Sequence, residues 1–484
     1  MYIPFPFFWM LYDQQGSKWI IQGTEMSGRV WGHTNIMPDQ IPTINPVLIL
    51  IFIPLFSFVI YPLVSKCVKL TPLRKMAAGG LFAVLAYVTT ALIQLKIQPS
   101  LPSRPHSGSS RVQFVNYAPC FANVALNTKS GVKSFTIPPA PENFDRHTQH
   151  SSYGHNFTVD APSDIYWTVT ANETHCFVNQ TGMFHAESRK GYIGLITQSH
   201  MGVYNESLRK ATEGEGQFKF SLNFLISGFE HEKATVIFCR PKKGGPKDND
   251  IHKILKSCDQ DNDNDDRRYF KYEMRTGESN DYVDIKHDKE AHEDRLFTVM
   301  PPGTYAVFLP DGRQPNRTDQ SQVFSWFSND EQGGIYTVTL HGDRADLEPS
   351  KWSNIHLEPL YQTSPDNNVN VLWQVPQYVI ITAAEILFSI TGLEFSYSQA
   401  PMSMKAVLQA VWFLCVAIGD IIIIFIVELE IFENQAYVFF LFAGIMLFIM
   451  FIFILEAFFY YEYVFYIAEE DENDTKNGKK SNKH

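Results

Sequence analysis

Apolar and polar residues lie in separate blocks along this chain, and the apolar blocks predict where it crosses a membrane. A helix of about 20 mainly apolar residues spans the roughly 30 Å of hydrocarbon in a bilayer. Six segments have a suitable length, three near each end of the sequence: about 3–22, 45–64, 76–95, 371–396, 407–427 and 436–461. We therefore predict a membrane α-helical protein with six spans.

The first of these segments is only moderately apolar, because it contains Asp13, Gln14, Gln15 and Lys18. A single helix of this composition would insert poorly into a bilayer. We expect it to form one wall of a helix bundle, with its polar face turned inward.

The polar middle of the chain has the pattern of β-structure. Short segments alternate apolar and polar residues between Gly, Pro, Asn and Asp, for example Phe218–Ile226, Ala234–Phe238 and Ile335–Leu340. A period of two predicts strands, and this length fits two β-sandwich-like lobes. The expected parts are 1–95 (three membrane helices), 96–233 (first β lobe), 234–370 (second β lobe), 371–467 (three membrane helices) and 468–484 (a charged, disordered tail).

Basic residues in the short loops predict the orientation. The loop Ser65–Lys75 carries four of them, which favours the cytoplasmic side. One further crossing makes the all-β insertion 96–370 extracellular, and six crossings leave both termini cytoplasmic. Five Asn-X-Ser/Thr glycosylation signals fall in that insertion: Asn156, Asn172, Asn179, Asn205 and Asn316. A sixth, at Asn473, should stay unmodified in the cytoplasmic tail.

Cysteine positions fit the same topology. Four cysteines lie in the proposed extracellular part, where disulfides form: Cys120, Cys176, Cys239 and Cys258. They allow three pairings, of which we favour Cys239–Cys258 with Cys120–Cys176. Cys67 and Cys415 should be free thiols.

Composition and motifs exclude several function classes. The formal net charge is −11, which argues against a nucleic-acid partner. No zinc-ligand spacing, Gly-x-Ser-x-Gly elbow or phosphate-binding glycine loop is found, so we predict neither an enzyme nor a metal or cofactor site. Asp259–Asp266 has the composition of a calcium loop but lacks the Gly and terminal Glu of that motif, and we interpret it as a solvated loop.

Glu385 is the residue that most needs an explanation. It lies near the middle of an apolar segment with no Lys or Arg close by in sequence. A charged side chain at that depth costs about 2.5–3.5 kcal/mol on insertion scales, so it usually faces a cavity, a partner or a proton path. A structural, protonated carboxyl is the alternative. Glu394, nearer the end of the segment, can reach water.

The residues around Glu385 resemble a known family. Glu385–Pro401 reads EILFSITGLEFSYSQAP, and Met404–Trp412 reads MKAVLQAVW. Together they resemble the tenth span and following loop of animal proton-coupled oligopeptide transporters, which are part of the major facilitator superfamily. Phe8–Trp19 is similar to the seventh span of that family, and Pro38–Asn45 is similar to the approach to the eighth.

The resemblance implies the second six-helix bundle of a major-facilitator-type transporter, with a large extracellular insertion between spans nine and ten. Such a carrier has twelve spans in two bundles, and substrate binds between the bundles. The Glu-x-x-Glu-Arg-Phe type motif of the first bundle has no counterpart here. We therefore expect a fragment that carries half of the central site and needs a missing amino-terminal six-helix bundle as partner.

The resemblance also implies roles for single residues. Glu385 matches the glutamate that faces the peptide amino terminus, and four more residues match positions lining the central cavity: Trp9, Gln15, Asn45 and Trp412. Ordinary helix packing is the alternative for the tryptophans and for Asn45. Asp420 departs from the family, which commonly has Asn there, and is a second candidate for proton coupling. A structural, protonated carboxyl is its alternative.

The implied function is proton-coupled symport of di- and tripeptides in the plasma membrane, with the proton as coupling ion, small peptides as substrates and the lipid bilayer around the helices. Two other functions stay open. The chain could be a membrane-anchored glycoprotein whose extracellular lobes bind protein partners, or a carrier for another small anion such as nitrate.

Overall fold

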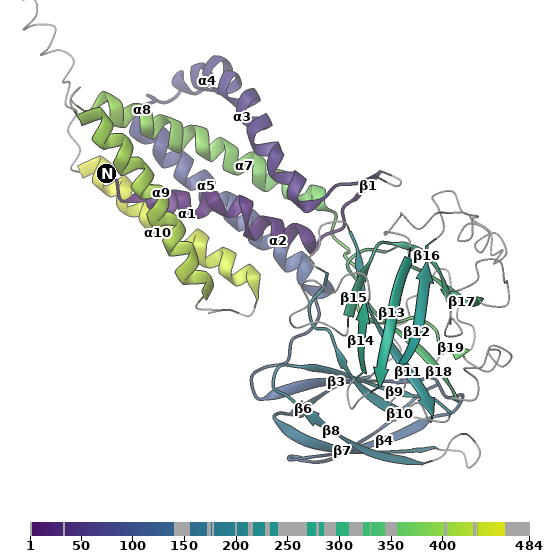
Figure 1. The fold of residues 1–484 in the computed structure, drawn as a ribbon. Helices are drawn as coiled ribbons and strands as arrows, with labels where there is room; N and C mark the ends of the chain where they lie inside the picture. The colour runs from purple at the N-terminus through teal and green to yellow at the C-terminus, as the bar shows by residue number, and fades with distance from the viewer. Residues whose placement is uncertain are drawn as a thin grey trace, which may run out of the picture. The chain divides into compact units, whose positions relative to one another are not determined.

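The chain divides into two compact units, which are described separately (Figure 1). In the computed structural model, one unit comprises Met1–Pro99 and Asn368–His484, and the other comprises Ser100–Asn367. The structure describes residues 2–31, 34–139, 155–171, 176, 179–198, 201–211, 216–227, 233–240, 269–276, 280–284, 297–308, 323–329, 331–343, 356–400, 404–428, 432 and 434–459.

The first unit is helical, apart from a small hairpin of β1 (Arg29–Trp31) and β2 (Thr34–Asn35). Two segments are π-helical, η3 (Phe56–Ile60) and η9 (Ile386–Ile390). The remaining helices and 3-10 turns are α1 (Pro4–Tyr12), η1 (Asp13–Gly16), α2 (Lys18–Thr24), η2 (Pro38–Thr43), α3 (Ile44–Leu55), α4 (Tyr61–Ser65), α5 (Pro72–Ile97), η4 (Gln98–Ser100), η8 (Val371–Gln374), α7 (Val375–Glu385), α8 (Thr391–Ser398), α9 (Lys405–Glu428) and α10 (Gln435–Phe459).

In the described part of the chain, five helical segments are long and apolar enough to cross a membrane. They are Pro38–Ser65, Pro72–Ser100, Val371–Ser398, Lys405–Val427 and Gln435–Phe459. The predicted span at 3–22 is not among them, because it forms two short helices, α1 and α2, on either side of η1 and Ser17. Gly16 and Ser17 are poor helix formers, which explains why the break falls there.

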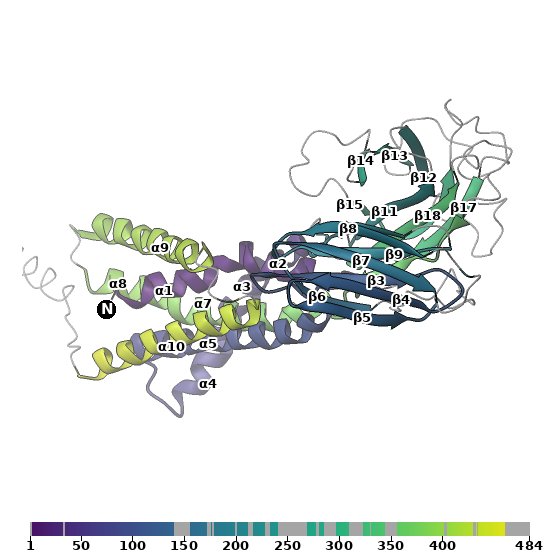
Figure 2. The same cartoon turned by 90° about the horizontal axis from the view of Figure 1, so that it is seen from below.

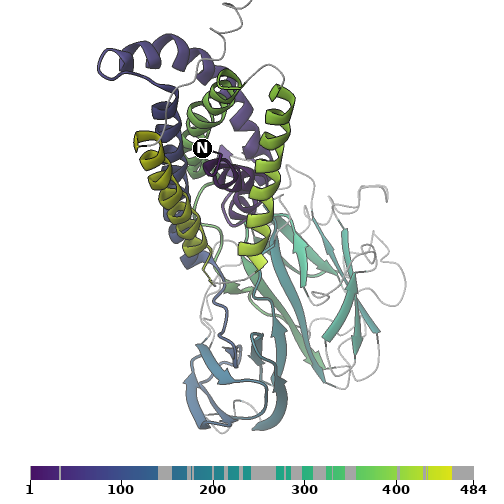
Figure 3. The same cartoon turned by 90° about the vertical axis from the view of Figure 1, so that its left-hand side faces the viewer.

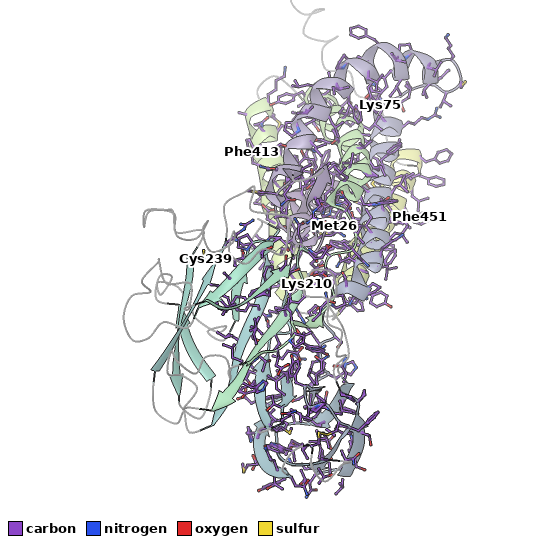
Figure 4. All side chains as sticks on the ribbon, turned by 90° about the vertical axis from the view of Figure 1, so that its right-hand side faces the viewer. Met26, Lys75, Lys210, Cys239, Phe413 and Phe451 are labelled. Atoms are coloured by element: carbon purple, nitrogen blue, oxygen red, sulfur yellow. A yellow bond between two sulfur atoms is a disulfide. The ribbon has the colours of Figure 1, made fainter. Side chains whose placement is uncertain are left out.

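The helices of this unit pack through aromatic side chains. α5 lies against α7 and α10, and α1 lies against α9 (Figure 2). Phe8 stacks on Phe388 with ring centroids 4.6 Å apart, and Trp19 meets Tyr378 edge-on at 4.9 Å. By contrast, Phe413 of α9 and Phe451 of α10 are exposed (Figure 4), as suits side chains that face lipid.

The second unit contains two pairs of β-sheets. In the first pair, the sheet order is β10-β9-β3-β6 in one sheet and β5-β4-β7-β8 in the other. Apolar side chains of both sheets form one core around Phe114, Val124 and Trp167. The strands are β3 (Ser109–Asn116), β4 (Ala122–Thr128), β5 (Gly131–Ile137), β6 (His155–Asp160), β7 (Ser163–Ala171), β8 (Gln180–Ala186), β9 (Gly191–Ile196) and β10 (Met201–Glu206).

The second pair has the orders β15-β11-β18-β19, with β20 also on β18, and β14-β13-β12-β16-β17. Phe220, Phe238 and Tyr305 lie in its core. The strands are β11 (Phe218–Ser227), β12 (Lys233–Cys239), β13 (Tyr269–Thr276), β14 (Asn280–Asp284), β15 (Phe297–Met300), β16 (Gly303–Phe308), β17 (Val323–Asn329), β18 (Ile335–Asp343), β19 (His356–Leu357) and β20 (Tyr361–Ser364).

The division between the sheet pairs differs from the expected one at 233/234. β11 pairs in parallel with β18 from Lys219–Ile335 to Ser227–Asp343, so it belongs to the second pair of sheets. The division therefore lies between β10 and β11. A strand's alternation does not reveal its partner, and β18 is more than 100 residues away in sequence.

Cysteines and glycosylation signals of this unit are partly described. Cys120 and Cys176 form the predicted disulfide. Cys239 is also disulfide-bonded, whereas Cys258 lies outside the described residues. Cys67 and Cys415 are free, as predicted.

Three glycosylation signals are exposed, Asn156, Asn179 and Asn205, while Asn172 and Asn316 lie outside the described residues.

Candidate functional site

The backbone around Glu385 is unusual, because this residue ends α7 immediately before the π-helical turn η9. π-turns inside helices are frequent at functional sites. α5 approaches this turn closely at Gly79, where an added Cβ would lie 2.6 Å from the Phe388 nitrogen. The Glu385 side chain is half-buried, and its Oε2 has no hydrogen-bond partner among the described residues.

A polar network from three helical segments surrounds that carboxyl group. Glu385 interacts with the Tyr12 hydroxyl and with the Asn45 side chain. Tyr12 Oη donates to Asn45 Oδ1 at 3.5 Å, and Asn45 Nδ2 donates to Gln15 Oε1 at 3.1 Å. Gln15 Nε2 in turn donates to the Tyr12 carbonyl at 3.1 Å. The end of α1, η1 and the start of α3 are thereby tied to α7 at one place.

Aromatic side chains from α1 and α9 lie beside this network. Trp9 and Trp412 meet edge-on with ring centroids 6.2 Å apart, and Trp9 meets Tyr12 edge-on at 5.3 Å. Phe5 packs on Trp412 at 4.9 Å. Trp412 is buried, and Trp9 Nε1 is buried with no acceptor in the described part of the chain. Each ring has a large apolar face that can pack against side chains of varied shape.

A second acidic group lies on the α1–α9 side. The carboxyl groups of Asp13 and Asp420 share a hydrogen bond, and Asp13 also interacts electrostatically with Glu385. The backbones approach closely next to this pair, since a Cβ on Gly419 would lie 2.7 Å from the Pro6 carbonyl oxygen. Two carboxyl groups can share a hydrogen bond only when one is protonated. The two carboxyl groups of Asp13 and Asp420 lie within hydrogen-bond reach of each other.

The structure thus brings together the five predicted substrate-site residues, with Asp420 beside them. Tyr12 and Asp13 also lie at this site, although neither was predicted as a site residue. Asp13 could have been proposed from the sequence, because an acidic residue inside an apolar segment needs a partner or a role. Tyr12 could not, because a tyrosine among apolar residues is common. Asp420 is exposed on α9 rather than enclosed. Within the described residues, no Lys or Arg forms an ion pair with any of the three acids.

The arrangement is rich in hydrogen-bond acceptors and negative charge. A cation such as an ammonium group can bind where a carboxylate, a phenol oxygen and amide oxygens converge. The flanking tryptophans suit an adjoining apolar group.

Comparison with known proteins shows which sequences this chain resembles. The POT family model matches residues 1–145 and 352–435. Peptide transporter family 1 of Caenorhabditis elegans is 32% identical over 501 residues, which cover 98% of this chain and 57% of that protein. Peptide transporter family 2 of the same organism is 33% identical over 492 residues, covering 97% and 59%.

A crystal structure of the POT family transporter PepTSo is 15% identical, with a TM-score of 0.36 over 94% of this chain and 39% of that one. This structural overlap is too low to add to the sequence matches. The chain spans somewhat more than half the length of the curated relatives it matches. The chain is therefore similar in sequence to the POT family over residues 1–145 and 352–435, and to peptide transporters of an animal over nearly its whole length.

Proposed function

We propose that this chain supplies the Glu385 side of the binding site in a proton-coupled symporter of di- and tripeptides in the plasma membrane. The observation that carries the proposal is the Glu385–Tyr12–Asn45 network, with its unpartnered carboxylate oxygen Oε2. Names of the relatives point the same way, since both nematode proteins are peptide transporters.

In this proposal the peptide ammonium binds at Glu385, which replaces the water that the ammonium loses. Asn45 and Gln15 offer amide donors and acceptors to the peptide backbone. Trp9 and Trp412 form the wall of a side-chain pocket. These contacts recognise the groups that all small peptides share and leave the side chains loosely specified.

Proton coupling follows from the same geometry. An ammonium beside a carboxyl group stabilises the ionised form, so Glu385 releases its proton when the peptide binds. In this proposal the released proton passes to the Asp13–Asp420 pair, because two adjacent carboxylates repel each other when both are ionised. The proton then crosses the membrane together with the peptide, so both move in the same direction.

A carrier for nitrate is less well supported. Three carboxyl groups converge here, and in the described part of the chain no Lys or Arg pairs with them. An anion would be repelled by such a site unless the carboxyls were all protonated. An anchored glycoprotein would have no use for the polar network between the membrane helices.

The test is uptake by cells that express the protein from its own gene. Labelled dialanine should accumulate at an external pH of 6, and a proton ionophore should abolish the accumulation. N-acetylated dialanine, which lacks the ammonium group, should compete poorly. Equal competition by both peptides, or accumulation that survives the ionophore, would overturn the proposal.

A further inference from the structure

The connection between α4 and α5 concentrates positive charge. Lys66, Lys69, Arg74 and Lys75 lie within ten residues, and the sequence has no Asp or Glu between Asp39 and Glu142. The first three are exposed, and Lys75 is half-buried. Figure 4 labels Lys75 at the end of the helical unit where α4 lies.

Local contacts position two of these basic side chains. The Lys75 ammonium lies 4.1 Å from the centroid of the Tyr61 ring, and Arg74 Nη1 donates to the Lys69 carbonyl at 3.0 Å. Thr71 caps the first turn of α5. The positive end of the α5 helix dipole therefore points at the same loop.

In the described part of the chain, no acidic side chain forms an ion pair with this group. Glu394 of α8 is close enough to interact with Tyr61, so it is the carboxylate that faces the loop from a packed neighbour. Within the described residues none of the four basic groups forms an ion pair. Among the described residues, the local charge around this loop is therefore positive.

The same surface is also apolar. Leu63 and Val68 are 63% and 48% exposed, and Phe58 of η3 is 80% exposed. The π-helical η3 separates α3 from α4, and α4 points away from the other helices (Figure 3). A soluble anion has no use for these side chains. A membrane surface offers hydrocarbon and negative charge at adjoining depths.

We propose that the segment from α4 to the first turn of α5, residues 61–75, binds the headgroups of anionic phospholipids. The lipid phosphate and carboxylate groups contact Lys66, Lys69 and Arg74, while Leu63 and Val68 reach the acyl region. Each basic residue beside an anionic membrane surface strengthens binding by about fivefold. This inference does not depend on which solute the protein carries.

Binding can be measured on the whole protein in a nonionic detergent. Cys67 is exposed and Cys415 is buried, so an environment-sensitive fluorophore can be placed on Cys67 inside the segment. Titration with short-chain phosphatidylserine should shift the emission at much lower concentration than phosphatidylcholine. Raising the salt concentration should weaken the phosphatidylserine response.

The variant Lys66→Gln/Lys69→Gln/Arg74→Gln should lose more than tenfold in apparent affinity for phosphatidylserine. Arg104→Gln/Lys190→Gln/Arg209→Gln removes the same charge from exposed positions in the β unit, and should bind as the unmodified protein does. Equal responses to both lipids, equal loss in both variants, or an equal shift with inorganic phosphate would each overturn the proposal.

Discussion

Glu385 is held half-buried at a π-turn, with one carboxylate oxygen left without a partner among the described residues. Replacing it by Gln keeps the size but removes the charge that meets the peptide ammonium. We expect Glu385→Gln to reduce proton-driven dipeptide uptake by at least about 100-fold, as for loss of a buried ionic contact of roughly 3 kcal/mol.

The matched control is Glu394→Gln, nine residues further along the same helical segment and exposed. It should keep uptake within about twofold, because an exposed charge contributes little. Concentrative uptake by Glu385→Gln at the level of Glu394→Gln would remove Glu385 from the site.

In the proposed mechanism, Asp420 and the neighbouring Asp13 hold the transported proton between them. Asp420→Asn leaves Asp13 beside an amide, which needs no shared proton. We expect the number of protons moved per peptide to fall by one, measured from the membrane potential at which uptake reverses. Asp13→Asn should have the same effect, and the double variant should add nothing. An unchanged ratio in both single variants would assign the pair a structural role.

Glu206 in the β unit pairs with Arg111 and is completely buried. Burial outweighs the attraction of Arg111 and raises the pKa of Glu206 to about 7 from its ordinary value of 4.5. The folded state therefore retains a proton between pH 4.5 and 7 that the unfolded state releases. The contribution to stability is complete below pH 4.5 and is lost as the pH rises through 7.

We expect local stability around β3 to fall by about 1–3 kcal/mol between pH 5 and pH 7.5. Hydrogen exchange of the β3 amides in the whole protein, corrected for the intrinsic rate, measures the change. Glu206→Gln should show little of this pH dependence, because the Gln side chain does not titrate. The same fall in the variant would assign the dependence to another group.

At the scale of elements, a buried glutamine cluster ties α2, α5 and α7 together. Gln22 Nε2 donates to the Thr90 carbonyl at 3.2 Å and to Gln94 Oε1 at 2.9 Å, and Gln22 Oε1 accepts from Gln374 and Gln377. All four glutamines are fully buried. Gln22 is the residue through which the three helices are joined.

Gln22→Leu leaves several buried amide groups without their partner, at about 1–3 kcal/mol for each group. We expect a fall of several degrees in the unfolding temperature of the protein in detergent. Thr89→Val is the control, because its hydroxyl lies on the exposed face of α5 and donates only within that helix, to Leu85. Equal unfolding temperatures for Gln22→Leu and the unmodified protein would show that water replaces the lost bonds.

Sequence patterns predicted the elements better than their partners. Hydropathy located five membrane helices and the strand-rich middle. A long continuous apolar run marks a membrane helix, whereas alternating apolar and polar residues mark a strand. Hydropathy missed the break at Gly16–Ser17, which depends on local backbone preference and on packing. It also placed β11 in the wrong lobe, since alternation cannot show that Phe220 pairs with Tyr336.

The same limit applies to the site. Glu385 and Asp420 were recognisable because an acid in an apolar segment needs a reason, and the family motif added Trp9, Gln15, Asn45 and Trp412. Tyr12 was missed, because its hydroxyl acquires a role only when α3 places Asn45 opposite it at 3.5 Å. Residues that act through a neighbour are not visible in a sequence until the neighbour is known.

At the scale of the whole molecule, the orientation of the chain in the membrane decides which side the β unit and the basic loop face. The basic loop Ser65–Lys75 predicts that 96–370 is extracellular. Within that part Asn156, Asn179 and Asn205 are exposed among the described residues, so each is accessible to a glycosylating enzyme there. We therefore expect removal of N-glycans to increase the electrophoretic mobility of the protein from cells.

Single Asn→Gln substitutions make this prediction specific. Each substitution at a glycosylated Asn should increase the electrophoretic mobility by the equivalent of one N-glycan. Asn473→Gln should not change the mobility, because the tail is predicted to lie in the cytoplasm. A step at Asn473 with none at the five other signals would invert the topology. The lipid-binding segment 61–75 would then face outward, and protons and peptides would have to enter the site from the opposite side.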